Sequence, residues 1–237
     1  MKIIQNRSKK SPMNHRNLVR ILSLSIFLSA CGGGGGDTTA STSDDAGGST
    51  TTSLSISGAA QKGPLILEST VQIQPLDIRL NPTGQIFSTQ VINDFGEFNF
   101  SGEITSPYVE IVVEGFFFDE LTSELSRSKI ALRSFAEVSS KMDVKANLLT
   151  TLQVNRLKHL IKNGAPFEEA QSQSISEVLA LFNIPSTDIS EFTAMDIAGS
   201  ADSDAILLAA SVILMQMATD MSPNSPIAKL TQILAQM

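Results

Sequence analysis

The chain of 237 residues has one cysteine, two histidines, one tyrosine and no tryptophan. A single cysteine excludes an internal disulfide framework and a structural zinc site built on several cysteines. Two histidines leave few side chains suited to general acid–base catalysis. The mean hydropathy of +0.10 excludes a protein with many membrane spans. The length leaves room for one or two domains, each with a hydrophobic core.

The first thirty residues contain no acidic side chain. They carry six basic ones, namely Lys2, Arg7, Lys9, Lys10, Arg16 and Arg20. An apolar stretch from Ile21 to Ala30 follows, which is too short for a transmembrane helix of about 20 residues. A basic segment, a short apolar segment and small residues at its end are typical of a secretory signal peptide. We therefore expect residues 1–30 to be a signal peptide, with Met13 as an alternative start.

The segment ends in Leu28-Ser29-Ala30-Cys31, which resembles the lipobox of bacterial lipoproteins. The resemblance implies that the Cys31 thiol carries diacylglycerol, that the signal peptide is cut before Cys31 and that the new amine is acylated with a fatty acid such as palmitate. Gly32 stands where inner-membrane lipoproteins of enteric bacteria carry aspartate, which implies the outer membrane of the cell envelope. An ordinary secretory signal beside an unrelated cysteine is the alternative.

Removal of the signal leaves 11 basic residues against 24 acidic ones, a net charge of −13. Because an acidic chain repels phosphate backbones, we expect no nucleic-acid partner. Residues 31–53 are mostly Gly, Ser, Thr and Asp, with too little apolar surface to offset the entropy of ordering. Residues 31–53 are therefore predicted to be a disordered linker. We expect the lipid on Cys31, and not a basic surface, to attach the protein to the membrane.

Residues 54–140 alternate between apolar and polar side chains, as in Val71 to Gln74 and Tyr108 to Glu114. Turn sequences such as Asn81-Pro82-Thr83-Gly84 and Asn93-Asp94-Phe95-Gly96 separate the alternating runs. The last of these runs is Lys129 to Val138. Short strands with turns at this spacing favour an antiparallel β-sandwich.

The order of these pieces resembles the carboxypeptidase regulatory-like, transthyretin-like β-sandwich. The resemblance rests on Gly58-Ala59 with Lys62-Gly63-Pro64, on Asp94 to Phe98, and on the run from Pro107 to Phe116. It implies an accessory domain without catalytic activity. A generic immunoglobulin-like sandwich is the alternative.

Residues 141–237 change to a helical period. Leu148 to Ile161 gives a broad apolar stripe, and Asn163-Gly164 is typical of a helix C-terminus. Ala205 to Met215 is almost wholly apolar, which predicts a helix buried inside a small bundle. The last apolar stripe runs to Met237, as expected either for a frayed end or for a shorter form of a longer family member. The predicted fold class is therefore α+β, an N-terminal antiparallel β-sandwich followed by a small α-helical bundle.

We predict no catalytic residue, no metal site and no cofactor. After the signal only His159 remains, and no Gly-x-Ser-x-Gly motif accompanies it. Three carboxylates near position 120 are candidates for the acidic pair of a glycoside hydrolase, but the absence of tryptophan and the single tyrosine argue against a sugar-stacking cleft. They are Asp119, Glu120 and Glu124. Three further carboxylates have a spacing that suits calcium, but the simpler expectation for the last two of them is a position at the N-terminus of a helix. These are Asp196, Asp202 and Asp204.

Phe116, Phe117 and Phe118 form an unusual aromatic run before Asp119. Because Phe117 would face opposite to its neighbours in a strand, one or two rings are candidates for an exposed binding patch. The alternative is that the helical part packs over them. The sequence thus predicts a lipid-anchored envelope protein that is not an enzyme and that acts as a binding or adhesion module for a protein or glycan. A periplasm-facing structural or assembly lipoprotein is the alternative, and a hydrolase is a more distant one.

Overall fold

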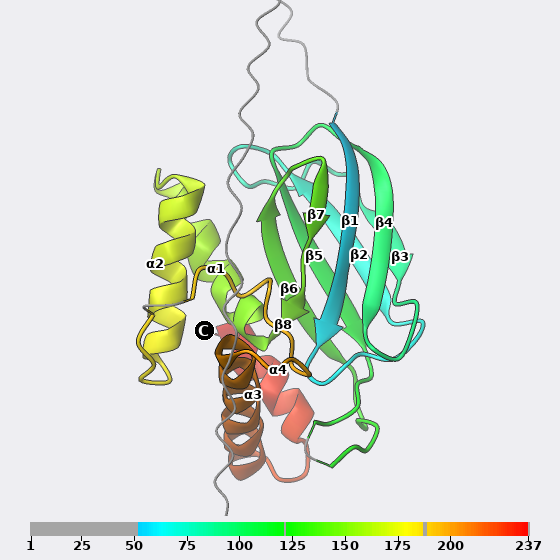
Figure 1. Ribbon diagram of the computed structural model, residues 1–237, viewed down its shortest axis with the longest axis vertical. Coiled ribbons are helices and arrows are strands. Elements are labelled where there is room, and N and C mark those ends of the chain that lie inside the picture. The colour runs from blue at the N-terminus through cyan, green and yellow to red at the C-terminus, as the bar shows by residue number, and fades with distance from the viewer. Residues whose placement is uncertain (1–51, 121, 187–188, 237) are drawn as a thin grey trace, which may run out of the picture. The chain divides into compact units, whose positions relative to one another are not determined.

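A computed structural model of the chain describes residues 52–120, 122–186 and 189–236. These residues form two four-stranded β-sheets and four α-helices, so the fold is mixed α+β (Figure 1). All of these elements belong to one compact unit, Gly47–Met237. The predicted signal peptide, Cys31 and the predicted linker up to residue 51 lie outside the described residues.

The first sheet is organised around β1 (Thr52–Gln61). β1 pairs antiparallel with β4 (Glu97–Ile104) and parallel with β7 (Lys141–Asp143) and β8 (Ala146–Asn147). All pairings within the predicted range 54–140 are antiparallel, whereas the two parallel strands lie at residues 141–147, where the sequence predicted helices. Strands as short as β7 and β8 carry no readable alternation, and a parallel partner needs a long crossover, which the second sheet provides here.

The second sheet has the order β3–β2–β5–β6, and all of its pairings are antiparallel. Its strands are β2 (Thr70–Leu76), β3 (Phe87–Gln90), β5 (Tyr108–Gly115) and β6 (Ile130–Glu137). The predicted alternation is confirmed in β2, where Val71 and Ile73 are fully buried and Thr70 and Gln72 are exposed.

The predicted turn at residues 93–96 carries the chain from the second sheet to the first. The Asn93 carboxamide oxygen accepts hydrogen bonds from the backbone N–H groups of Phe95 and Glu97. Gly96 has a φ of +79°, and a Cβ at this position would lie 2.3 Å from the Ala60 carbonyl oxygen. Glycine is therefore required by both conformation and space.

The helices are α1 (Leu148–Lys162), α2 (Phe167–Ala180), α3 (Asp202–Met221) and α4 (Pro226–Gln236). Asn147 caps α1, because its side chain accepts from the Thr150 N–H while the Thr150 hydroxyl accepts from the Asn147 N–H. The predicted end of α1 is confirmed, since Asn163 is the C-cap and Gly164 has a φ of +93°.

Both sheets and the helices contribute to one hydrophobic core. Its members include Ile56 and Phe98 of the first sheet and Ile73 and Ile111 of the second. Its helical members include Leu149, Leu152, Leu207, Leu214 and Leu230. Hydrogen bonds join α1 to β6; among them, the Thr150 hydroxyl donates to the Arg133 carbonyl, and the Thr151 hydroxyl accepts from the Arg133 N–H. The helices lie beside the sheets and share their core (Figure 1).

Helix α3 departs from the prediction of a wholly buried helix. Leu207, Leu214 and Ala218 are buried, but Leu208 and Ile213 are exposed. One face of α3 packs on the core and on α4, whereas no described residue covers the other face. A composition that is apolar all round could not by itself indicate which face would be covered.

Candidate functional site

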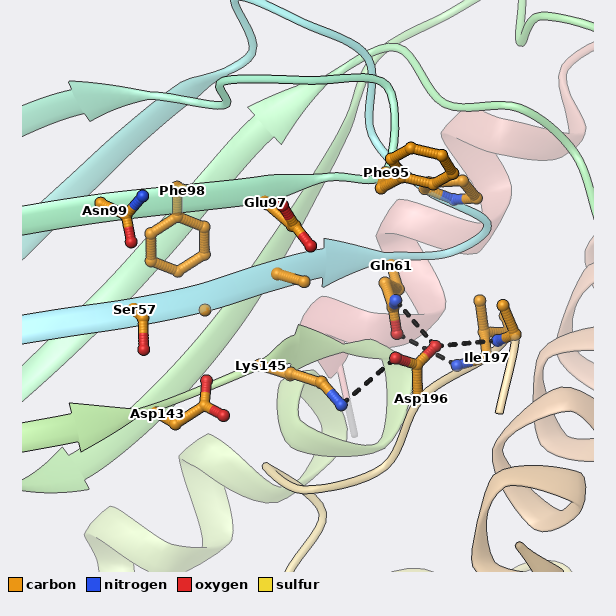
Figure 2. Close-up of a pocket in the computed structure, with 14 residues that line it drawn as sticks. Ser57, Gln61, Phe95, Glu97, Phe98, Asn99, Asp143, Lys145, Asp196 and Ile197 are labelled. Atoms are coloured by element: carbon orange, nitrogen blue, oxygen red, sulfur yellow. Dashed lines mark hydrogen bonds and ion pairs between the residues drawn. The ribbon is translucent and has the colours of Figure 1, made fainter. Parts of the chain in front are cut away.

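The first sheet carries a cleft of about 470 Å³, lined by four separate chain segments (Figure 2). The segments are residues 57–61 with Pro64, residues 95–99, residues 143–145 and residues 196–198. This volume lies in the range of about 300–1,000 Å³ that small-molecule pockets occupy. We take this cleft as the candidate functional site.

Asp196 forms a fixed centre at one end of the cleft. Its Oδ1 accepts hydrogen bonds from the Gln61 side-chain amide at 3.0 Å and from the Ala198 N–H at 2.9 Å. The Lys145 ammonium lies 3.3 Å from its Oδ2. Partial burial raises the pKa of Asp196, but these donors and the Lys145 charge outweigh it, so the pKa is lowered overall and the carboxylate is ionised at neutral pH.

Gln61 connects this centre to the sheet. Its side chain is buried, donates to Asp196 and accepts from the Ile197 N–H at 3.0 Å. Lys145 also donates to the Ala194 carbonyl at 3.2 Å. The segment around Asp196 is thereby held to β1 and to Lys145 in the short connection between β7 and β8. The backbone also approaches closely at Gly58, where a Cβ would lie 2.1 Å from the Val144 carbonyl oxygen.

The rest of the cleft is a mixture of polar side chains and one exposed ring. Phe95 is 72% exposed, and Glu97, Asn99 and Asp143 are exposed as well. The Glu97 carboxylate accepts from the Asn93 side-chain amide at 2.7 Å. Because Lys145 is paired with Asp196, Glu97 and Asp143 give the cleft an acidic balance. An aromatic ring beside hydrogen-bond acceptors suits a ligand with an apolar face and donor groups.

The three phenylalanines of the predicted patch differ in their burial. Phe117 is fully buried in the core, and the Lys62 ammonium lies 5.3 Å from the centroid of its ring. Phe116 is partly buried, and the Lys129 ammonium lies 6.0 Å from its ring centroid. Phe118 is 37% exposed and forms an isolated β-bridge with Leu125. Only Phe116 and Phe118 therefore have rings that an external partner can touch.

The acidic residues at positions 119–124 do not form a pair of facing carboxylates. Glu120 is buried and its Oε1 lies 2.6 Å from the Lys62 ammonium. The Ser211 hydroxyl of α3 donates to the same oxygen. Asp119 accepts from the backbone N–H and the hydroxyl of Thr122, and Glu124 is exposed. None of these residues lines the cleft.

The carboxylates considered for calcium accept hydrogen bonds from backbone N–H groups or lie at the start of α3. Asp204 accepts from the N–H groups of Asp196 and Ala201, while Asp202 begins α3 and is exposed. The predicted position of Asp202 and Asp204 in the first turn of a helix is confirmed, but the N-cap residue is Ala201 and not Asp202 or Ser203. No group of three or more His, Cys, Asp or Glu side chains in the described part of the chain could hold a metal ion.

His159 lies on α1 near its C-terminus, exposed, with a ring nitrogen 3.0 Å from the Asn163 side-chain amide. It does not line the cleft. The cleft residues Gln61, Glu97 and Lys145 were not predicted from the sequence. No local motif marks them, because they come together only through the pairing of distant segments.

Comparison with protein-family models, with curated proteins and with solved structures finds no match to this chain.

Proposed function

We propose that this chain is a lipid-anchored bacterial envelope protein that acts as a non-catalytic binding module. The observation that carries the proposal is Leu28-Ser29-Ala30-Cys31, in which the only cysteine of the chain follows a basic and then an apolar segment. In this proposal Cys31 holds the lipid in the outer membrane, and residues 31–53 form a spacer. Residues 54–140 form a β-sandwich of the carboxypeptidase regulatory-like kind, followed by the helical residues 141–237.

The candidate ligand site is the cleft of the first sheet. Phe95 supplies an exposed apolar surface at its rim, and Glu97, Asn99 and Asp143 supply hydrogen-bond acceptors. The ionised, fully partnered Asp196 holds the wall of the cleft in one arrangement. A wall that is ordered before binding lowers the entropy cost of binding. We propose a protein or glycan segment as the ligand.

The lipid anchor is tested by metabolic labelling with a fatty-acid analogue. The wild-type chain should be labelled and should fractionate with the envelope. The Cys31→Ser variant should lose the label and remain uncut or become soluble. Labelling that survives this substitution would refute the anchor.

The orientation is tested by protease treatment of intact and opened cells, with a periplasmic protein as control. Digestion in intact cells supports adhesion or ligand capture at the surface. Protection until the envelope is opened supports the second candidate, a periplasm-facing structural or assembly lipoprotein. The exposed Phe118 and Leu125, which face each other across a β-bridge, favour a docking role in that case.

The cleft is tested with a photo-crosslinking amino acid placed at Phe95. Ile78 is the matched control, because it is 77% exposed and lies outside the cleft. We expect a covalent adduct from position 95 and none from position 78. Equal yields at the two positions would show that the cleft is not the binding site.

A further inference from the structure

Helix α3 is predominantly apolar. Its 20 residues include no lysine and no arginine, and its only charged side chains are Asp202, Asp204 and Asp220. By length and composition alone it is the one helix among the described residues that could cross a membrane. Core helices of soluble proteins pass the same test, but they are mostly buried, and only 33% of the apolar window of α3 is buried.

The buried face of α3 argues against a membrane span. Leu207, Leu214 and Ala218 pack in the hydrophobic core, and Ser211 donates to the buried Glu120 carboxylate. A helix that crossed the bilayer would lose all of these contacts and leave Glu120 with one partner fewer. The packing therefore keeps α3 on the surface of the folded unit.

The opposite face of α3 is uncovered by any described residue and carries an apolar ridge, beside which the exposed Gln216 donates a hydrogen bond to Asp220. Ile213 is 51% exposed and Met221 is 58% exposed, with Met217 between them on the same i, i+4 ridge. Ala209, which is exposed, extends this ridge toward the start of the helix. A helix that is hydrophobic all round is normally covered on all sides. An uncovered apolar ridge of this length marks an interaction surface.

We propose that this ridge, defined by Ala209, Ile213, Met217 and Met221, lies on the surface of the lipid bilayer, with its side chains in the boundary between head groups and acyl chains. The inference rests on the proposed lipid anchor at Cys31. Cys31 and the first described residue, Thr52, are joined by 21 peptide units, which span about 70 Å at most. The anchor therefore holds the folded unit within reach of the membrane at all times.

The area of the ridge favours the bilayer over a second copy of the chain. A helix of 20 residues is about 30 Å long and about 10 Å wide, so one face offers roughly 300 Å². A stable protein interface needs about 800 Å² from each partner. A tethered helix needs far less, because the lipid anchor already supplies most of the binding energy.

The charge of the helix specifies the kind of contact. Since α3 has no basic side chain and the chain is acidic, attraction to anionic lipids cannot hold it to the membrane. The contact is expected to be made by the apolar side chains of the ridge, with Asp220 beside it facing the aqueous head-group layer. It should form on zwitterionic phosphatidylcholine and should be insensitive to salt.

The test uses the lipidated protein reconstituted into phosphatidylcholine vesicles, with an environment-sensitive fluorophore on Ile213→Cys. The Cys31 thiol is consumed by the lipid, so the new cysteine is the only free thiol. The control is Ser101→Cys, an exposed position on β4. We expect blue-shifted emission at position 213 that nitroxide-labelled lipids quench at least threefold more than at position 101, in both 50 mM and 500 mM salt.

The outcomes separate this inference from the proposed function. Vesicle flotation of the protein with water-like emission at position 213 overturns the inference and leaves the anchor intact. Blue-shifted emission that appears only at high protein-to-lipid ratio, without quenching by nitroxide lipids, assigns the ridge to a second copy and also overturns it. Failure of the wild-type protein to float refutes the anchor, and with it the reason for placing α3 at the bilayer.

Discussion

The Lys62 ammonium lies 2.6 Å from the Glu120 carboxylate, and both side chains are buried. Lys62 comes from the segment after β1, Glu120 from the segment after β5, and Ser211 of α3 donates to the same carboxylate oxygen. Glu120 Oε2 has no hydrogen-bond partner among the described residues. This ion pair therefore joins both sheets and α3 at one point, and it is incompletely satisfied.

A double-mutant cycle at this pair should show strong coupling. Lys62→Met or Glu120→Leu alone should each lower the free energy of unfolding by about 3–5 kcal/mol, because each leaves a buried charge without its partner. The double variant Lys62→Met/Glu120→Leu should lose less than either single variant, because no buried charge remains. Urea unfolding of the four proteins measures this, and strictly additive losses would contradict it.

Glu110 should make the stability depend on pH. Burial raises the pKa of its carboxyl. Hydrogen bonds and positive charge from Lys158 and Arg133 lower this pKa by more than burial raises it, so the folded pKa lies below the ordinary value of 4.5. The ionised carboxylate thus stabilises the fold above that value, and the contribution is lost as the pH falls through the folded pKa.

Glu110→Gln should therefore lower the free energy of unfolding by about 2 kcal/mol at pH 7, less than for a fully buried pair, since Lys158 and Arg133 are partly exposed. The difference from the wild-type protein should shrink below pH 4. Glu114→Gln is the control, because Glu114 is exposed on the same strand. A difference that stays constant from pH 7 to pH 3 would argue against the ion-pair explanation.

Phe117 and Phe118 should respond in opposite ways to truncation. Phe117→Ala should cost about 3–5 kcal/mol, because it removes a fully buried ring and leaves a cavity. Phe118→Ala should cost less than about 1 kcal/mol, because the ring is partly exposed. Thermal unfolding distinguishes the two. Loss of partner binding by Phe118→Ala at unchanged stability would identify that ring as part of a docking surface.

Substitutions at Gly96 and Gly84 separate the cost of a positive φ from the cost of a steric clash. Both have positive φ, +79° and +88°, but a Cβ at Gly96 meets the Ala60 carbonyl oxygen, whereas none of the described atoms lies within 4 Å of a Cβ at Gly84. Gly84→Ala should cost about 1 kcal/mol from strain alone. Gly96→Ala should cost clearly more, and equal losses in melting temperature would show that the contact with Ala60 relaxes freely.

Much of the local structure could be predicted from the sequence, because it is written in neighbouring residues. Alternation in Val71 to Gln74 indicates a strand, and Asn163-Gly164 marks the end of α1. The turn at residues 93–96 depends on two local features: the hydrogen-bonding side chain of Asn93, and a glycine without a side chain at position 96. The strands β7 and β8 were missed because they are too short to show a period, and their parallel pairing depends on β1, some eighty residues earlier.

The candidate cleft could not be predicted, because its parts carry no local signal. Gln61, Lys145 and Asp196 are ordinary polar residues in the sequence. The pairing of β1 with β8 places Gln61 near Lys145, and backbone contacts of residues 192–193 with the segment around β8 bring Asp196 to both.

The sequence by itself determined the α+β class of the described residues, since the change of hydrophobic period near residue 142 is a local property of the chain. It also supplied the basis for the proposed lipid anchor, because the lipobox-like sequence at residues 28–31 is a short linear motif. Tertiary structure alone decided which apolar side chains are covered. Phe117 and Ile213 are both hydrophobic in the sequence, but Phe117 is enclosed by the core whereas Ile213 faces outward. Burial depends on what the rest of the chain places over a residue, and that information is spread over the whole fold.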